Sequence, residues 1–400
     1  MNSSKNAKPR LVVLLSRFPY PLEKGDKLRA FHQITGLSEQ FDIYLICLTE
    51  FEIKSNDLEV INQYCKEVHL FKLNRLLQIF SLFNCFFTEK PFQVAYFWQY
   101  HIHRKIGKII ERVHPEYIFS QLIRTTEYIK DYHKCPKVLD YMDVLSKGIE
   151  RRIEIQPWYL KYLFKQEFIR LRNYERYIFD YFEQHIIISE QDQSYIIHPK
   201  SKEIAILKNG ISEKFFISSK YNTPTYDLVF TGNMSYIPNI EASKYIVKEI
   251  IPLLNKDIKL LISGIKPSKS VLKLKTNQVE ISGWVEDIRE SYLQAKVFVA
   301  PMFLGTGLQN KLLEAMALGI PCVTTTMANT ALGAIPEESI LIANSKDEFK
   351  FQIERLLKDD ELYSKIKNQG KAFVKDHFSW ISLNEQLTEL IVNSTNKMMN

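Results

Sequence analysis

The sequence lacks several patterns that would assign it quickly to a common class of protein. Its five cysteines include no Cys-x-x-Cys pair and no cysteine–histidine spacing of the zinc-site type. This favours reduced thiols in the cores of a cytoplasmic protein. No apolar run reaches the roughly 18 residues of a membrane span, since residues 76–87 are interrupted by polar side chains. The polar N-terminus, followed by only a short apolar run at 11–15, predicts no secretion signal.

Two further absences limit the classes of function. The loop after the first apolar run has no Gly-x-Gly-x-x-Gly, the fingerprint of dinucleotide binding, which argues against a dehydrogenase. The net charge of +7 is modest for 400 residues, and no nucleic-acid-binding module is recognisable. We therefore expect no nucleic acid among the partners.

The residues that are present predict an α/β protein. A chain of 400 residues with 46% hydrophobic residues can form two domains of about 200 residues each. Apolar, β-branched runs alternate with helical patterns in both halves, as at 10–16 and 41–48 in the first half and 227–231 and 259–264 in the second. Continuous apolar runs are typical of parallel strands covered on both faces. The domain boundary is predicted near Pro199.

The most informative stretch is 295–326, which reads as strand, glycine loop, helix and strand. At 100° per residue, Gly307, Asn310, Lys311 and Glu314 fall on one polar stripe of an otherwise apolar helix. A helix N-terminus behind a glycine loop suits a phosphate, Lys311 adds a positive charge, and Glu314 offers an acceptor for ribose hydroxyls. The alternative is an ordinary loop followed by an i,i+3 surface pair.

This segment resembles the donor-binding region of retaining glycosyltransferases of family 4, which carry Lys-x-x-Glu-Ala-Met-Ala-x-Gly-x-Pro as residues 311–321 do here. The resemblance extends over nearly the whole chain and is most detailed with bacterial sugar transferases of exopolysaccharide and capsule clusters. It implies the GT-B architecture, with two Rossmann-like domains facing a cleft. Residues 1–199 would form the acceptor-side domain and 200–377 the donor-side domain. Residues 378–400 would form a helix that packs back on the first domain.

The resemblance also implies donor-side residues. Asn233 stands in a βα-turn that precedes an arginine or lysine in many family members, so the phosphate charge would depend more on Lys311, with Lys266 as a second contact. Trp284 would pack against the base, unless it is a packing tryptophan. Thr306 replaces the first glutamate of the family's paired-glutamate pattern, which normally holds the donor sugar. The full donor-side set is Gly25, Gly232, Asn233, Lys266, Trp284, Val285, Gly305, Thr306, Gly307, Leu308, Asn310, Lys311 and Glu314.

On the acceptor side, Asp140 and Asp143 end the strand predicted at 137–141, at the edge where open α/β sheets place their ligands. Two carboxylates there can orient an acceptor hydroxyl or take its proton. For either residue taken singly, helix capping by Asp143 and Ser146 is the alternative. The resemblance adds Asp26 and Arg29 to the acceptor side, with ordinary loop and capping chemistry as the alternative.

Two aromatic segments bear on the acceptor. Residues 76–100 are rich in phenylalanine, and we expect most of these rings in the core and a part exposed. The helical stretch 148–182 interleaves basic and aromatic residues, which suits a membrane interface. A solvated helix with a buried aromatic face is the alternative that we favour.

These observations predict a metal-independent glycosyltransferase, with Asp143, Asp140 and Lys311 as catalytic residues. It would transfer a sugar from a UDP or GDP donor to a glycan or lipid-linked glycan in cell-surface polysaccharide synthesis, in the cytoplasm or at the inner membrane face. No metal is expected because an Asp-x-Asp site is missing and Lys311 can carry the diphosphate charge. No other cofactor is expected. A sugar-nucleotide epimerase or hydrolase of the same fold and a non-catalytic partner subunit are the alternatives.

Overall fold

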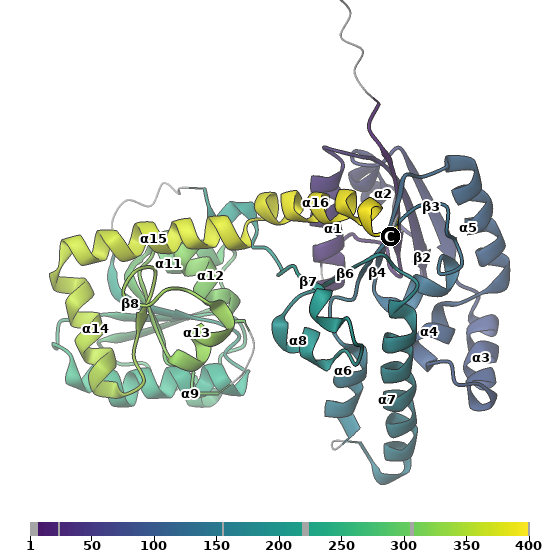
Figure 1. Cartoon of the computed structure of the whole chain (residues 1–400). Helices are drawn as coiled ribbons and strands as arrows, with labels where there is room; N and C mark the ends of the chain where they lie inside the picture. The colour runs from purple at the N-terminus through teal and green to yellow at the C-terminus, as the bar shows by residue number, and fades with distance from the viewer. Residues whose placement is uncertain (1–6, 23–24, 154–155, 218–223, 305–307, 399–400) are drawn as a thin grey trace, which may run out of the picture. The chain divides into compact units, whose positions relative to one another are not determined.

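The computed structural model describes residues 7–22, 25–153, 156–217, 224–304 and 308–398. The chain divides into two compact units. The first contains residues up to Asn209 together with those from Leu383 onward, and the second contains Gly210–Ser382. Each unit has its own parallel sheet with helices around it, and the two are described separately (Figure 1).

The sheet of the first unit has seven parallel strands in the order β3-β2-β1-β4-β5-β6-β7. The strands are β1 (Arg10–Leu15), β2 (Asp42–Thr49), β3 (Glu67–Lys72), β4 (Tyr117–Gln121), β5 (Lys137–Asp140), β6 (Gln184–Ile187) and β7 (Ala205–Ile206). In β1, five of the six residues are buried because helices cover both faces of the sheet.

The helices of the first unit are α1 (Gly25–Leu37), α2 (Ser55–Asn62), α3 (Arg75–Asn84), α4 (Phe92–Phe97), α5 (Tyr100–Val113), α6 (Leu145–Ile153), α7 (Trp158–Phe179) and α8 (Glu190–Tyr195), with the 3-10 helices η1 (Cys85–Phe87) and η2 (Ile123–Tyr128). The C-terminal helix α16 (Trp380–Met398) belongs to this unit from Leu383 onward. Its buried Leu383, Leu387 and Ile391 repeat every four residues, and Asn384 Nδ2 donates to the carbonyl of His32 over 2.9 Å.

The sheet of the second unit has six parallel strands in the order β10-β9-β8-β11-β12-β13. The strands are β8 (Tyr226–Thr231), β9 (Leu260–Ser263), β10 (Val279–Gly283), β11 (Ala295–Ala300), β12 (Cys322–Thr324) and β13 (Leu341–Ile342). The helices are α9 (Ile237–Tyr245), α10 (Lys269–Leu272), α11 (Ile288–Leu293), α12 (Asn310–Ala317), α13 (Thr326–Leu332), α14 (Lys346–Lys358) and α15 (Asp360–Phe378).

Both sheets have the doubly wound strand order. The second and third strands are added on one side of the first strand, and the fourth strand is added on its other side. The switch points therefore lie between β1 and β4 in the first unit and between β8 and β11 in the second. Ligands of open α/β sheets bind beyond the carboxyl ends of the strands at such points. The prediction of two Rossmann-like domains is therefore confirmed, and the strand order predicts where each would bind its ligand.

The structure corrects the prediction at the domain junction. Residues from 200 onward were expected to form the second domain, but β7 pairs with β6 through Ile186↔Ala205 and extends the first sheet. The division between the units therefore falls after Asn209, ten residues beyond the expected Pro199. A strand of two residues carries too little pattern to be assigned to a sheet from the sequence.

The structure also corrects the expected burial of the aromatic segments. Most rings of 76–100 were expected in the core, yet Phe80, Phe83, Phe86 and Phe87 are exposed on α3 and η1. The first turns of α7 are likewise exposed at Trp158, Tyr159 and Tyr162, so this part of the helix has no buried aromatic face. Figure 1 shows α6 and α7 extending together away from the sheet of the first unit. No helix in the described part of the chain is long and apolar enough to cross a membrane.

Candidate active site

At the carboxyl edge of the second sheet, two glycines leave the backbone uncovered by side chains. Gly232 follows β8 and Gly264 follows β9, with φ angles of +156° and +144°. A Cβ on Gly264 would lie 1.7 Å from the carbonyl oxygen of Gly232, and a Cβ on Gly232 would lie 2.6 Å from Asn239 Nδ2. No side chain fits at either position, so bare backbone borders the switch point between β8 and β11.

Lys311 reaches this edge from the first turn of α12. Its Nζ donates to Asn239 Oδ1, lies 4.8 Å from the centre of the Phe230 ring, and is 3.9 Å from the sulfur of Met302. Asn239 is itself held in place, because its Nδ2 donates to the carbonyl of Asn233 over 3.0 Å. Burial lowers the pKa of Lys311 to about 8. The ammonium is thus half-buried among neutral groups, which leaves its charge available to an anion.

Glu314 lies one turn further along α12 and has a different partner. Its Oε2 accepts a hydrogen bond of 2.7 Å from the hydroxyl of Tyr292, which in turn accepts one of 2.6 Å from Thr231 Oγ1. Tyr292 and Thr231 are buried. Burial raises the pKa of Glu314 above its ordinary value, and the hydrogen bond from Tyr292 opposes that shift. Lys311 and Glu314 are therefore two separately positioned groups rather than an ion pair with each other.

Trp284 follows β10 on the same edge and leaves 69% of its surface exposed. This excludes the alternative of a packing tryptophan. Val285 beside it is half-buried. Lys266, just past β9, is exposed and has a left-handed φ of 52°, a conformation that is uncommon for a residue other than glycine.

The other predicted donor residues differ in what they do. Asn233 is exposed, and its Oδ1 accepts from the backbone N–H and the hydroxyl of Ser235, so the side chain shapes the turn after β8. Leu308 packs against the core, and Asn310 is the exposed first residue of α12. Gly25 begins α1 and thus belongs to the first unit. Gly305, Thr306 and Gly307 lie outside the described residues.

In the first unit, Arg29 and Asp140 form a buried ion pair. Arg29 Nε donates to Asp140 Oδ2 over 2.7 Å, and both side chains are almost wholly inaccessible to solvent. The Arg29 guanidinium also binds the carbonyls of Leu207 and Lys208 and the Oδ1 of Asn209. Arg29 was predicted on the acceptor side and Asp140 as catalytic. The geometry corrects both: they tie α1 and β5 to the segment after β7.

Asp143 is the exposed carboxylate of the predicted pair. It follows Met142, a buried residue with a left-handed φ of 58°. Desolvation, followed by the charges of Asp192 and Asp140, raises the pKa of Asp143. The capping alternative is not observed, because the N-terminus of α6 is bound by Glu175, which accepts from the N–H and the hydroxyl of Ser146 over 2.9 and 2.6 Å.

Asp26, also predicted on the acceptor side, is paired with Arg17 over 2.6 Å. Within the described ranges, no three or more His, Cys, Asp or Glu side chains gather as a metal site would require.

Four residues of these edges were missed by sequence reasoning: Tyr292, Asn239, Arg17 and Arg124. Tyr292 binds Glu314 of α12, 22 residues further along the chain, and Asn239 binds Lys311 of α12, 72 residues further along. Arg17 could have been noticed, since it comes directly after the first predicted strand. Arg124 carries no local signal.

Comparison with known proteins assigns the second unit. Residues 225–359 match the family model described as "Glycosyl transferases group 1". The matched residues lie in the second unit and include Gly232, Trp284, Lys311 and Glu314. The match confirms the enzyme class predicted from the sequence, a glycosyltransferase.

Three more distant similarities cover nearly the whole chain. An uncharacterized 44.6 kDa protein in the cps region of Klebsiella pneumoniae is 22% identical over 385 residues, covering 92% of this chain and 96% of that protein. The structure of HepE from Anabaena in complex with UDP-glucose is similar with a TM-score of 0.58 at 12% identity, over 96% of this chain and 99% of HepE. The UDP-GlcNAc 2-epimerase from Neisseria meningitidis, bound to UDP-GlcNAc, gives a TM-score of 0.53 at 13% identity, over 96% and 100% of the two chains. The solved structures establish the shared fold.

Proposed function

We propose that this glycosyltransferase moves a sugar from a nucleotide-sugar donor to a glycan or lipid-linked glycan acceptor in cell-surface polysaccharide synthesis. The observation that carries the proposal is the carboxyl edge of the second sheet, where Lys311 lies beside the open backbone of Gly232 and where Glu314 and Trp284 also stand. Each residue suits a different part of a nucleotide diphosphate. The relative from the cps region supports the role in polysaccharide synthesis.

In this proposal, Lys311 binds the diphosphate of the donor. The charge on the leaving diphosphate grows as the glycosidic bond breaks, and a cation held among neutral groups stabilises that charge more than one in water. Asn239 and the Phe230 ring hold the ammonium in place before the donor arrives. Lys311 would supply this stabilisation without a metal ion. The donor would carry UDP or GDP, and the resemblance to family 4 implies retention of configuration at the transferred sugar.

Glu314 and Trp284 would bind the nucleoside. Glu314 offers carboxylate oxygens to ribose hydroxyls, with its orientation fixed by Tyr292. Trp284 exposes a large aromatic face, which can stack on a base. Asp143 would act on the acceptor, as a base or an orienting group for its hydroxyl.

We further propose that the first unit binds a membrane surface, which would bring it to a lipid-linked acceptor. The face of α3 and η1 exposes Leu76, Phe80, Phe83, Phe86 and Phe87, and Arg75 is the single charged residue of α3. Phe86 contacts Phe92 with ring centres 5.6 Å apart, and Arg170 of α7 lies 5.2 Å from the Phe92 ring. These contacts join the apolar face to α7, whose first turns expose Trp158. Aromatic residues beside cations are typical of membrane interfaces.

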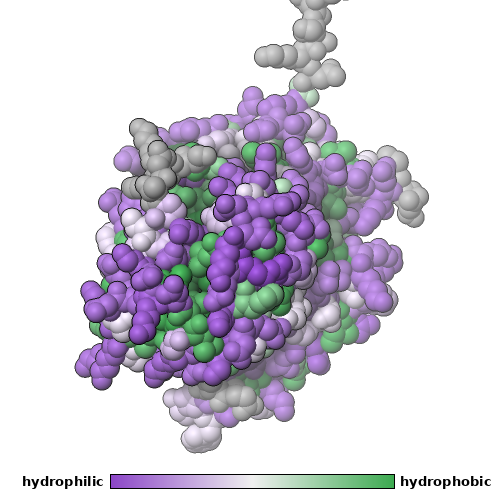
Figure 2. Space-filling model, turned by 90° about the vertical axis from the view of Figure 1, so that its left-hand side faces the viewer, coloured by the Kyte–Doolittle hydropathy of each residue, from purple (hydrophilic) through white to green (hydrophobic). Residues whose placement is uncertain are grey.

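The second unit offers a comparison for this apolar face. On the side drawn in Figure 2, polar residues cover much of the surface and apolar ones form patches between them. Phe351 is the single exposed large apolar residue of α14, whereas α3 and η1 expose several together. It therefore serves as a control for the exposed rings of α3.

Calorimetry of the purified chain with UDP, GDP, dTDP and CMP tests the proposed function. We expect binding of UDP or GDP, weakened in Lys311→Ala and unchanged in Lys358→Ala, whose lysine pairs with Glu354 on the surface of α14. No binding of any nucleotide, with both units folded, would contradict the proposal.

A hydrolase or epimerase acting on the nucleotide-sugar is the second candidate. It is favoured by the similarity of fold to the UDP-GlcNAc 2-epimerase and by Thr306, which stands where the family has its first glutamate. Such an enzyme would convert its donor without any acceptor. Incubation of UDP- and GDP-sugars with the enzyme alone, followed by chromatography of the sugar and nucleotide products, separates the two functions.

A further inference from the structure

Two arginines flank the switch point of the first sheet. Arg17 comes two residues after β1, and Arg124 comes three residues after β4. These strands are neighbours, paired through Leu15↔Gln121. The carboxyl ends of the first and fourth strands are where a doubly wound sheet binds its ligand. Both guanidinium groups therefore start from the strand ends that are best placed for a substrate.

The backbone just before Arg124 adopts an unusual conformation. Leu122 has φ and ψ angles of 65° and 148°, a region that is almost restricted to glycine. It is buried, and its N–H donates to the carbonyl of Asp140 over 2.8 Å. Just beyond the neighbouring strand β5, Met142, which precedes Asp143, also has a positive φ, of 58°. Strained residues of this kind persist where the surrounding structure enforces them, and they cluster at functional sites.

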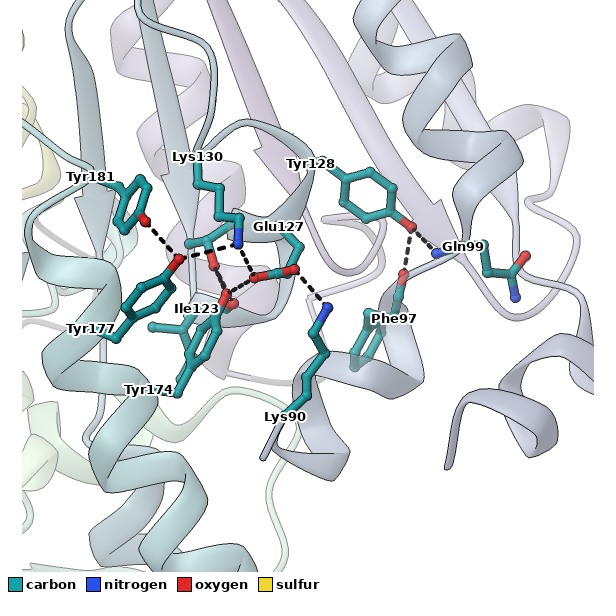
Figure 3. Close-up of polar contacts among 11 residues, drawn as sticks. Lys90, Phe97, Gln99, Ile123, Glu127, Tyr128, Lys130, Tyr174, Tyr177 and Tyr181 are labelled. Atoms are coloured by element: carbon teal, nitrogen blue, oxygen red, sulfur yellow. Dashed lines mark hydrogen bonds and ion pairs between the residues drawn. The ribbon is translucent and has the colours of Figure 1, made fainter. Parts of the chain in front are cut away.

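The 3-10 helix that carries Arg124 is fixed on several sides (Figure 3). Glu127 accepts a hydrogen bond of 2.8 Å from Tyr174 of α7 and pairs with Lys90 over 2.7 Å. Tyr128 donates to the carbonyl of Phe97 over 2.6 Å and accepts from the N–H of Gln99. Every residue from Thr125 to Tyr128 is buried. Arg124 is thus a half-buried, partly solvent-facing side chain on a short helix that cannot easily shift.

The guanidinium of Arg124 is held in position by neutral groups. Its Nε and Nη2 donate to Gln93 Oε1 over 3.2 and 2.7 Å, and its central carbon lies 5.6 Å from the centre of the Phe97 ring. Burial, and next the charge of Arg17, lowers the pKa of Arg124 to about 10, while Asp26, Asp143 and Glu50 act in the opposite direction. A partly buried cation whose direct partners are an amide and a ring is costly unless an anion binds to it.

A cavity adjoins Arg17. It has a volume of about 160 Å³ and is lined by residues at the ends of β1 and β2, among them Ser16, Arg17, Lys27, Thr49 and Glu50. That space fits a phosphate or carboxylate group rather than a whole oligosaccharide.

We propose that the acceptor carries an anionic group, a phosphate or a carboxylate, and that Arg124 and Arg17 bind it at the carboxyl edge of the first sheet. That the anion belongs to a sugar acceptor rests on the proposed function, whereas the anion site itself does not. Arg17 lines the cavity but already shares its charge with Asp26. Arg124 does not line the cavity, but its direct partners are an amide and a ring, so its charge is the less compensated of the two. Binding there would place the anionic group at the edge where Asp143 follows β5, the strand paired with β4.

Modification of the full chain by phenylglyoxal, which reacts with accessible arginines, tests the site directly. The modification rate of each arginine is followed by peptide mass spectrometry, with and without pyrophosphate or glucuronate. At ten times its dissociation constant, the bound anion should slow the modification of Arg124 and Arg17 about tenfold. Arg10, which pairs with Glu116 at the opposite end of β1, is the internal control and should be unaffected. Protection by pyrophosphate alone identifies a phosphate-bearing acceptor, and protection by glucuronate alone an acidic sugar.

Arg124→Gln should remove most of the protection of Arg17, whereas Arg10→Gln, with the same change in charge, should not. Equal modification of Arg124 with and without both anions would refute the proposal in the wild-type protein, whether or not the variant folds. Calorimetry with UDP and GDP on the same sample separates the two claims. Protection of Arg124 without nucleotide binding would contradict the proposed function and support the anion site. Nucleotide binding without protection of Arg124 would support the proposed function and contradict the anion site.

Discussion

The hydroxyl of Tyr292 donates a 2.7 Å hydrogen bond to Glu314 and accepts a 2.6 Å bond from Thr231. Because a phenol has a single proton, the bond from Thr231 directs the proton of Tyr292 toward Glu314. One carboxylate oxygen is thereby occupied and the other is oriented. Tyr292 thus acts as a positioning residue for the group that we assign to the ribose.

Tyr292→Phe should therefore weaken the binding of nucleoside diphosphate through the ribose alone. A charged hydrogen bond of this kind contributes about 1.5–3 kcal/mol, so affinity for UDP or GDP should fall at least about tenfold, as it should in Glu314→Gln. Affinity for the 2′- and 3′-deoxy analogues, measured by calorimetry, should fall less in both variants. An equal loss for ribo- and deoxyribonucleotides would indicate general damage to the second unit instead.

Lys311 should make nucleotide binding depend on pH in the alkaline range. Its pKa of about 8 means that the ammonium loses its proton above that pH, so affinity for diphosphate should decline from pH 8 upward. Binding at pH 8 should take up about half a proton, because the anion favours the charged form. Calorimetry in buffers of different ionisation enthalpy measures this uptake. Lys311→Gln should show neither effect, and a pH-dependent decline that persists in this variant would assign it to another group.

The same shift has a consequence for folding with a definite sign. The pKa of an unfolded lysine is about 10.4, above the value of about 8 for Lys311 in the folded chain. Between these values the unfolded state binds more protons. The contribution of Lys311 to the free energy of unfolding therefore rises with pH across this interval.

The strand alternation and the polar stripe of α12 could be predicted because both depend on local periodicity. The stripe of Lys311 and Glu314 is observed at the carboxyl edge of the second sheet. The partners of these residues could not be predicted, because Asn239 and Tyr292 come from other elements. The ion pair between Arg29 and Asp140 could not be predicted either, because these residues are 111 positions apart, and both were therefore assigned to a site. Sequence pattern places residues at an edge without showing which of them pair with each other.

The aromatic segments show a second limit of the sequence. A helix such as α3 has a regular apolar face whether another element covers it or not. Most rings of 76–100 were therefore expected to be buried, whereas Phe83 and Phe87 are among those that are exposed. Their exposure depends on how α3 packs against α4, which is a tertiary property.

Replacement of Trp284 should separate base binding from folding. Since 69% of the side chain is exposed, Trp284→Ala should change the free energy of unfolding by less than about 0.5 kcal/mol. Stacking on a base contributes about 1–3 kcal/mol, so nucleotide affinity should fall about 5- to 150-fold. Trp284→Phe should restore part of it. Unchanged affinity in the alanine variant would place the base elsewhere.

The membrane proposal predicts that the exposed rings of α3 and η1 are needed for binding to vesicles. The wild-type chain should co-sediment with anionic vesicles at low salt and be partly released at high salt, because salt screens the cationic contribution. The double variant Phe83→Ser/Phe87→Ser should bind less, while Phe351→Ser in the second unit should bind as the wild type does. Equal binding of both variants would remove α3 from the interface.

Replacement of Asp140, at the end of β5, and of Asp143, just after it, should have different effects. Asp140→Asn leaves the buried Arg29 without its carboxylate, and loss of one partner of such a pair costs about 3–5 kcal/mol in the free energy of unfolding. Asp143→Asn changes an exposed carboxylate and should cost less than about 0.5 kcal/mol. If Asp143 accepts the proton of the acceptor or orients its hydroxyl, sugar transfer should fall by about 10²–10⁴-fold while UDP or GDP affinity stays near that of the wild type.

Urea denaturation measures the free energy of unfolding of both variants, and calorimetry measures their affinity for nucleotide. Sugar transfer is measured with a labelled donor and a membrane extract that contains lipid-linked glycans. Because its surroundings raise the pKa of Asp143, a role as base further requires that transfer increase with pH as the carboxyl loses its proton. Loss of nucleotide affinity together with activity in Asp143→Asn would assign Asp143 to the donor side or to a structural role. Retained transfer in this variant would exclude Asp143 as the base. Because Asp140 is already bound to Arg29, a phosphate oxygen of the donor would then be the best candidate to receive the proton.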